Sequence, residues 1–252
     1  MENREFYIKC DGINLHAKLD FPREDKEKYP CVIVVHGLTG HMEETHIKAV
    51  ANACNEMGYA ALRVDMYGHG KSEGEFKNHT VTHWVLELMQ IIDYVNSLEF
   101  VTDVYLTGHS QGGLTVILTA AVKKDAIKAI MPLSPALMAK DVALHGGFPN
   151  TEYDPDNMGE NIMLFGEHEI STNYMRTCRF LPIDEAIHDF DKKVLLVHAD
   201  TDELVPYRYA VEAQKKYKDA RLVTIPDDDH CYLKHLSMVT DAVKEFLQDM
   251  NK

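Results

Sequence analysis

The stretch that decides the fold is VYLTGHSQGGLTVIL, residues 104–118. Its apolar start, Val104–Leu106, is typical of a short buried strand, and Gln111–Val122 has a helical pattern. Between them stands a glycine–x–serine–x–glycine motif, in the strand–sharp turn–helix setting that presents a serine at the edge of a sheet. We therefore predict a strand that ends at an exposed serine, Ser110.

The flanking residues suit a serine that acts as a nucleophile. Glycine at positions 108 and 112 removes side chains that would collide with the strained backbone of the serine. Gln111 begins the helix, so its backbone N–H points toward an oxyanion formed when Ser110 attacks a carbonyl. We predict Ser110 as nucleophile, Gln111 as an oxyanion donor and the adjacent His109 as a substrate-binding residue. A glycine-rich turn with an incidental serine is the alternative.

Outward from this stretch, short β-branched runs alternate with helical patterns along most of the chain. Repeated strand–helix–strand units imply a mostly parallel sheet with helices on both faces, in the α/β class. A chain of 252 residues suits one domain, residues 1–252. We predict strands at 6–10, 13–19, 31–35, 60–64, 104–106, 127–133, 194–198 and 222–225, and helices at 46–57, 84–98, 111–122, 207–217 and 236–250.

One segment interrupts this alternation, at about residues 135–191. Its prolines and glycines break both patterns, and a loop of this length inside a compact domain usually has a function. We predict a lid inserted after the sixth strand, with its own hairpin or short helices. A solvated excursion is the alternative, but it would expose five aromatic side chains without purpose, those of Phe148, Tyr153, Phe165, Tyr174 and Phe180.

A serine needs a base and a group that orients the base. Of 14 histidines, His230 stands out because it follows a predicted strand and a turn-like run of three aspartates, which we expect to be solvated, and precedes the last helix. The acid should lie between serine and histidine in the chain. Both Asp200 and Asp202 follow the strand at 194–198, and the spacing before Val205-Pro206 favours Asp202.

A second oxyanion donor is expected in the loop after the strand at 31–35. That loop reads His-Gly-Leu-Thr-Gly, residues 36–40. We predict the backbone N–H of Leu38 as the donor and Gly37 as a residue that lets substrate approach closely. His36 is expected to be structural.

The charge and the cysteines narrow the partners. A formal net charge of −14 disfavours nucleic acid, anionic membranes and polyanionic substrates, so neutral esters or amides fit better. A charged N-terminus without an apolar run, and five scattered cysteines, predict a cytoplasmic protein with reduced thiols. No membrane span is expected. His79 and His83 lack the glutamate of a zinc motif, and we predict no metal and no cofactor.

Together these motifs resemble the α/β-hydrolase superfamily, and in detail the bacterial cinnamoyl (feruloyl) esterases. The resemblance runs over nearly the whole chain and is carried by residues 36–41 with Glu44 and His46, by 65–72 (DMYGHGKS), by 108–113 (GHSQGG) and by 132–135 (PLSP). It implies hydrolysis of hydroxycinnamate esters and a lid that shapes a pocket for the aromatic acyl group. Phe165 and Tyr174 are then candidates for that wall. Ala199 replaces a common glycine in the acid loop, and the lid is the least family-like part.

The predicted function is therefore hydrolysis of a small aromatic carboxylic ester through an acyl-enzyme. A monoacylglycerol lipase or a general short-chain carboxylesterase is the alternative among enzymes, with a peptidase or thioesterase less favoured. A hydrolase-like binding protein is the alternative outside them, although it need not retain Ser110, Asp202 and His230 together. The oligomeric state is left open, a homodimer included.

Overall fold

A computed structural model describes residues 2–151 and 153–252 of the chain. Met1, the first residue of the charged N-terminal run, and residue 152, inside the predicted insertion, lie outside the described residues. Eight strands form one sheet in the order β1-β2-β4-β3-β5-β6-β9-β10. Their bounds are Arg4–Cys10 (β1), Ile13–Asp20 (β2), Tyr29–Val35 (β3), Ala60–Val64 (β4), Val101–His109 (β5), Ala129–Leu133 (β6), Lys193–Ala199 (β9) and Ala220–Ile225 (β10).

The sheet is mostly parallel. β1 pairs antiparallel with β2, and β2 pairs antiparallel with β4, whereas every pair from β4 to β10 is parallel. The central strands β3 and β4 are buried on both faces, as their continuous apolar runs require. The predicted α/β class and mostly parallel sheet are confirmed.

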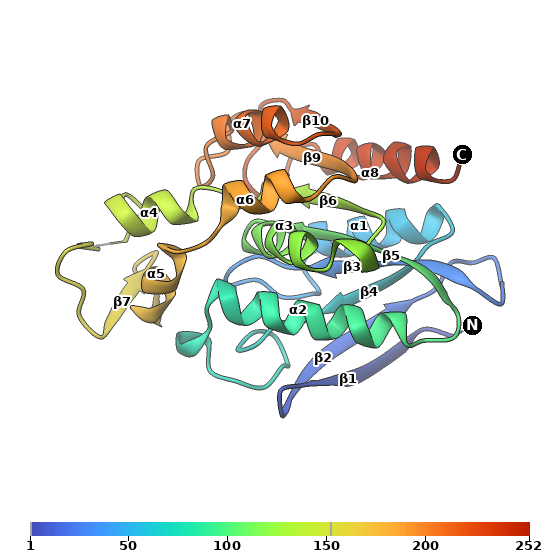
Figure 1. The fold of residues 1–252 in the computed structure, drawn as a ribbon, viewed down its shortest axis with the longest axis horizontal. Coiled ribbons are helices and arrows are strands. Elements are labelled where there is room, and N and C mark those ends of the chain that lie inside the picture. Colours follow the sequence, from blue (N-terminus) through green and yellow to red (C-terminus); the bar gives the residue numbers. More distant parts are fainter. Residues whose placement is uncertain (1, 152) are drawn as a thin grey trace.

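Helices cover both faces of this sheet (Figure 1). The side chains of α1 and α8 share one buried cluster with one face, and those of α2, α3 and α6 share the other. The helices are Thr45–Glu56 (α1), Val81–Asn96 (α2), Gln111–Val122 (α3), Ala139–His145 (α4), Asn173–Cys178 (α5), Ile183–Asp189 (α6), Arg208–Lys216 (α7) and Leu236–Met250 (α8), with 3₁₀ turns at Phe76–Asn78 (η1) and Lys124–Ala126 (η2).

The segment between β6 and β9 contains α4, a two-stranded hairpin, α5 and α6. The hairpin pairs Asn161–Leu164 (β7) antiparallel with His168–Ser171 (β8). In Figure 1, α4, β7 and α5 project beyond the left-hand end of the sheet, whereas α6 lies over the sheet beside α3. Helix α6 therefore packs in the helical layer as a connection to β9.

The structure differs from two of the predictions. Helix α2 begins at Val81 instead of residue 84, because the hydroxyl of Thr80 accepts the backbone N–H of His83 and caps the helix there. Phe180 is 82% exposed, so this aromatic ring does not help to cover the protein as we expected. Among the described residues, no helix combines the length and apolar character needed to cross a bilayer.

Candidate active site

Ser110 stands at the sharp turn between β5 and α3. Its backbone has φ +55° and ψ −119°, and its N–H donates to Leu133 O at 2.9 Å. A side chain at Gly108 would meet the carbonyl oxygen of Gly112 at 2.5 Å, and one at Gly112 would collide with the carbonyl of His36. The two glycines therefore permit a positive-φ serine packed between two strands.

His230 and Asp202 are joined by a short hydrogen bond. His230 Nδ1–H donates to Asp202 Oδ2 at 2.7 Å, which leaves Nε2 unprotonated in the neutral ring. Asp202 Oδ1 accepts the backbone N–H groups of Leu204 and Val205 at 2.9 and 2.8 Å. Asp200 is instead exposed and accepts Asp227 N–H at 2.8 Å, so it does not contact His230.

Asp202 is fully buried yet stays ionised. Burial alone would raise its pKa, but hydrogen bonds from His198 and His230, the charge of His230 and the Val205 N–H lower the pKa of Asp202 well below its ordinary value. We did not identify His198 from the sequence, because it is one of 14 histidines and lies within an apolar strand. Its Nε2–H donates to Val205 O at 2.9 Å and lies 3.4 Å from Asp202 Oδ2.

The loop that carries His230 is organised by buried groups. The expectation of a solvated turn is wrong for Asp228, which is 1% exposed and accepts backbone N–H groups of Asp229, Lys234 and His235. Three turn N–H groups need acceptors, and a carboxylate can supply them inside the fold. Tyr232, fully buried, donates to Val197 O at 3.2 Å. These contacts fix His230 relative to β9.

His109 holds the backbone of His230. It is 3% exposed, and its Nε2–H donates to the carbonyl oxygen of His230 at 2.7 Å. Its Nδ1 lies 3.2 Å from Nε2 of His46, whose N–H can donate to it only if the His109 ring is neutral. Burial keeps both rings neutral, lowering the pKa of His46 to about 4 and that of His109 well below its usual value. His109 borders the cavity, but its ring nitrogens bond to protein.

The loop after β3 forms a tight turn. Gly40 N–H donates to Gly37 O at 3.2 Å, and Thr39 has φ +63°. His36 Nδ1–H donates to Gly37 O at 2.7 Å, while its Nε2 accepts Met66 N–H at 3.0 Å. These bonds require a neutral ring, and burial lowers the pKa of His36 to about 3. Neither contact uses the N–H of Leu38, which remains available to a ligand.

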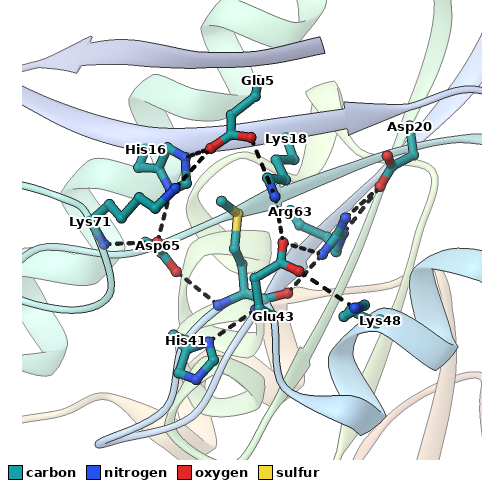
Figure 2. A network of polar contacts seen from close by, with 11 residues as sticks. Glu5, His16, Lys18, Asp20, His41, Glu43, Lys48, Arg63, Asp65 and Lys71 are labelled. Atoms are coloured by element: carbon teal, nitrogen blue, oxygen red, sulfur yellow. Dashed lines mark hydrogen bonds and ion pairs between the residues drawn. The ribbon is translucent and has the colours of Figure 1, made fainter. Parts of the chain in front are cut away.

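A polar network supports this loop from the side of β1 and β2 (Figure 2). Asp65 accepts Met42 N–H at 2.8 Å, His16 Nδ1–H at 2.9 Å and Lys71 N–H at 3.0 Å. Arg63 donates to Met42 O at 3.0 Å and also pairs with Asp20. The segment that follows Leu38 is thereby tied to the sheet at both its N–H and its C=O groups.

One cavity of about 150 Å³ is lined by all of the predicted site residues except Asp202. Its lining contains Gly37, Leu38, His109, Ser110, Gln111, Phe165, Tyr174 and His230. The Ser110 hydroxyl and the His230 imidazole face the same cavity, although no hydrogen bond joins these two described side chains; such contacts often tighten only when substrate binds. Asp202 stands behind His230, outside the lining.

The outer wall of the cavity comes from the segment after β6. The Tyr174 hydroxyl donates to Gln111 Oε1 at 2.7 Å and so connects α5 to α3. Phe165, at φ +55°, packs on Phe148 with ring centroids 5.0 Å apart. The same segment adds the apolar side chains of Ala136, Met138, Ala139, Val142 and Met175, and the loop after β9 adds Leu204 and Val205.

Comparison with known proteins gives consistent matches. A family model described as serine aminopeptidase, S33, matches residues 26–149, and one described as TAP-like protein matches 167–252. A structure of Est1E from Butyrivibrio proteoclasticus with ferulic acid bound has a TM-score of 0.95 and 47% identity over 98% of this chain and 100% of that chain.

More distant relatives share the fold. The mitochondrial palmitoyl-protein thioesterase ABHD10 of Rattus norvegicus is 24% identical over 83% of this chain and 69% of its own length. The structure of the alpha/beta hydrolase domain-containing protein 10 from mouse has a TM-score of 0.76 at 18% identity, covering 98% of this chain and 99% of that one. The chain therefore belongs to the α/β-hydrolase family, within which it resembles the cinnamoyl esterases, as its motifs indicate.

Proposed function

We propose that this carboxylic-ester hydrolase cleaves esters of hydroxycinnamic acids through an acyl-enzyme on Ser110. The observation that carries the proposal is one cavity with two kinds of wall. Ser110 and His230 line one side, with Asp202 bonded to His230 behind it, and apolar and aromatic side chains line the other. The ferulic acid bound to Est1E, at 47% identity, supports an aromatic acyl group for the second wall.

In the acylation step, the Ser110 hydroxyl attacks the ester carbonyl carbon while His230 Nε2 takes its proton. Asp202 keeps the other ring proton on Nδ1, so Nε2 is the free base, and the carboxylate stabilises the imidazolium that forms. The carbonyl oxygen becomes an oxyanion that accepts hydrogen bonds from the backbone N–H groups of Leu38 and Gln111. Gln111 is the first residue of α3, so its N–H has no acceptor inside the helix.

In the second half, the tetrahedral intermediate collapses and the ester C–O bond breaks. The His230 imidazolium gives its proton to the leaving alcohol. Water then attacks the acyl carbon, with His230 as base, and the acid leaves as Ser110 recovers its proton. No redox step or added group is needed to balance these transfers.

The segment at residues 135–191 is proposed to act as the lid over the acyl group. Support comes from Phe165 and Tyr174, which line the cavity from this segment. Tyr174 is nearly buried, and burial raises its pKa well above the ordinary value, so its hydroxyl stays protonated and keeps its bond to Gln111.

Turnover of four esters by the wild type and Ser110→Ala tests the function. Methyl ferulate, methyl p-coumarate, p-nitrophenyl butyrate and a monoglyceride are compared at equal enzyme concentration. We expect the highest kcat/KM for the two hydroxycinnamates, and a loss of roughly 10⁴-fold or more in kcat for the variant. A preference for the monoglyceride, or substantial turnover by Ser110→Ala, contradicts the proposal.

The setting of the protein is also proposed. We infer a cytoplasmic location, supported by the five free cysteines, four of them buried. A homodimer remains a prediction, which light scattering of the purified chain tests directly.

A further inference from the structure

One side chain in the cavity differs in charge from the others. Glu44 is the one acidic residue among the described residues that line it, and no lysine or arginine joins it there. The side chain is 28% exposed. Although Glu44 directly precedes α1, its carboxylate makes no capping hydrogen bond to that helix. The ordinary role of an acidic residue at a helix start therefore does not account for it.

The neighbouring Glu43, in the same loop, forms ion pairs with lysine and arginine side chains, which Glu44 does not form among the described residues. Glu43 lies 3.0 Å from Lys18 Nζ, 2.9 Å from Arg63 and 3.5 Å from Lys48, and Figure 2 shows it pointing into that network. Glu44, by contrast, is contacted by the backbone N–H of His41 at 3.3 Å. Among the described residues it forms no ion pair with a lysine or arginine.

The neighbouring His46 does not neutralise Glu44. Nε2 of His46 lies 4.0 Å from the Glu44 carboxylate, but it donates its hydrogen to His109 Nδ1 at 3.2 Å. Burial lowers the pKa of His46 to about 4, so this ring is neutral at pH 7. Burial also raises the pKa of Glu44, as expected for a carboxylate with few compensating partners.

Glu44 stands on the leaving-group side of the cavity. A side chain at Gly40 would meet the Glu44 carboxylate carbon at 2.9 Å, so the carboxylate packs over the loop that carries Leu38. Its neighbours in the cavity include His230 and Cys231, the residue after the base. Burial and then the Glu44 charge raise the pKa of Cys231, and the His230 charge partly offsets the effect of burial on the pKa of Glu44. Because His230 protonates the departing alcohol, the alcohol must lie beside the imidazole, whereas the acyl group points toward the apolar wall.

We propose that Glu44 is a specificity-determining residue for the alcohol half of the ester. Its unpaired negative charge favours esters of neutral or cationic alcohols, such as a sugar hydroxyl, and disfavours alcohols that carry a carboxylate near the ester oxygen. The inference rests on the proposed function for the direction in which the alcohol leaves. It depends on no particular acyl group.

The test compares three esters that share the feruloyl group and differ in the charge of the alcohol. They are feruloyl quinate (anionic), methyl ferulate (neutral) and feruloyl choline (cationic), assayed at pH 8 and low ionic strength. In Glu44→Gln, the ratio of kcat/KM for the anionic to the neutral ester should rise roughly tenfold, the size expected for one charge a few ångströms away in partly solvated protein. The cationic-to-neutral ratio should fall by several-fold.

The matched control is Glu43→Gln, which removes the same charge one residue away. Its carboxylate faces Lys18, Lys48 and Arg63. We expect both ratios to stay within about twofold of the wild type, since exposed or screened charges couple weakly. Equal shifts in the two variants would overturn the proposal, because they would indicate an effect of net charge alone.

Other outcomes separate this inference from the proposed function. If Glu44→Gln changes all three esters by one factor and shifts the pH–rate profile, Glu44 acts through His230 and the specificity proposal fails. If the wild type hydrolyses none of the feruloyl esters, the proposed function fails. The ratios are then measured on acetyl esters of the same alcohols, and an unchanged ratio there refutes the role of Glu44. Added salt should reduce the wild-type discrimination.

Discussion

The two walls of the cavity are built in different ways. The wall that carries Ser110 and His230 is held by directed hydrogen bonds: Asp202, His109 and Asp228 each bond a group of His230 or of its loop. The wall from the segment after β6 presents mainly apolar side chains to the cavity. Hydrogen bonds such as Phe165 N–H to the Thr151 hydroxyl and Arg179 Nε–H to Ala143 O lie within this segment, and the Tyr174 hydroxyl bonds across the cavity to Gln111. Directed bonds specify orientation, whereas apolar contacts specify shape and tolerate substitution.

This difference predicts where a change is costly. Replacing the group that orients the base should abolish most activity, since the wrong histidine tautomer cannot take the serine proton. A side chain that only shapes the pocket changes affinity for one substrate class.

Asp202→Asn should give the largest effect. The amide can donate to His230 Nδ1 and so favour the tautomer with its hydrogen on Nε2, which cannot act as base. We expect kcat for methyl ferulate to fall by roughly 10³- to 10⁴-fold with little change in KM. Asp200→Asn, whose side chain bonds to Asp227 N–H instead, is the control and should retain most activity. Similar losses in both variants would contradict the assignment.

The hydrogen-bonded wall should also weaken in acid. His46 has a folded-state pKa of about 4, below its ordinary value of 6.5, so the stability it contributes is fully present above pH 6.5 and is lost as pH falls toward 4. Between pH 7 and pH 5 this costs up to about 2 kcal/mol. Urea unfolding at both values should show a smaller difference for His46→Gln than for the wild type, and an equal difference would contradict this.

The apolar wall should give a smaller and more selective effect. Phe165→Ala removes an aromatic ring from the cavity, so kcat/KM for methyl ferulate should fall about tenfold while kcat/KM for methyl acetate falls less. Phe180→Ala makes the same chemical change on the same segment at an 82% exposed position. It should leave turnover unchanged and unfolding within about 0.5 kcal/mol of wild type. Steady-state kinetics with both esters decide this.

The sequence allowed the sheet and its helices to be predicted well because their signals are local. Helix α3 and strand β4 have the predicted bounds, 111–122 and 60–64. The motif around Ser110 predicts the sharp turn at this residue because the turn geometry depends on the glycines within a few residues of it. The choice between Asp200 and Asp202 also had a local signal, in the spacing to Val205-Pro206.

Other parts of the site had no such signal. His198 reads as one residue of a buried strand, and its approach to Asp202 depends on how the next loop folds back over β9. Asp228 reads as part of a polar turn, yet it is buried because three N–H groups of the following residues converge on it. From the sequence we expected the Phe180 ring to be buried, but the packing of α5 and α6 leaves it exposed to solvent.

By itself, the sequence determined the order of strands and helices along the chain and the sharp turn that presents Ser110, because hydrophobic period and backbone strain act between near neighbours. The tertiary structure alone decided which side chains meet across long stretches of chain. It brought His109 to the carbonyl of His230, joined Tyr174 to Gln111 and, among the described residues, gave lysine and arginine partners to Glu43 but not to Glu44. Such meetings depend on the packing of the whole sheet and its helices, which no short stretch of residues encodes.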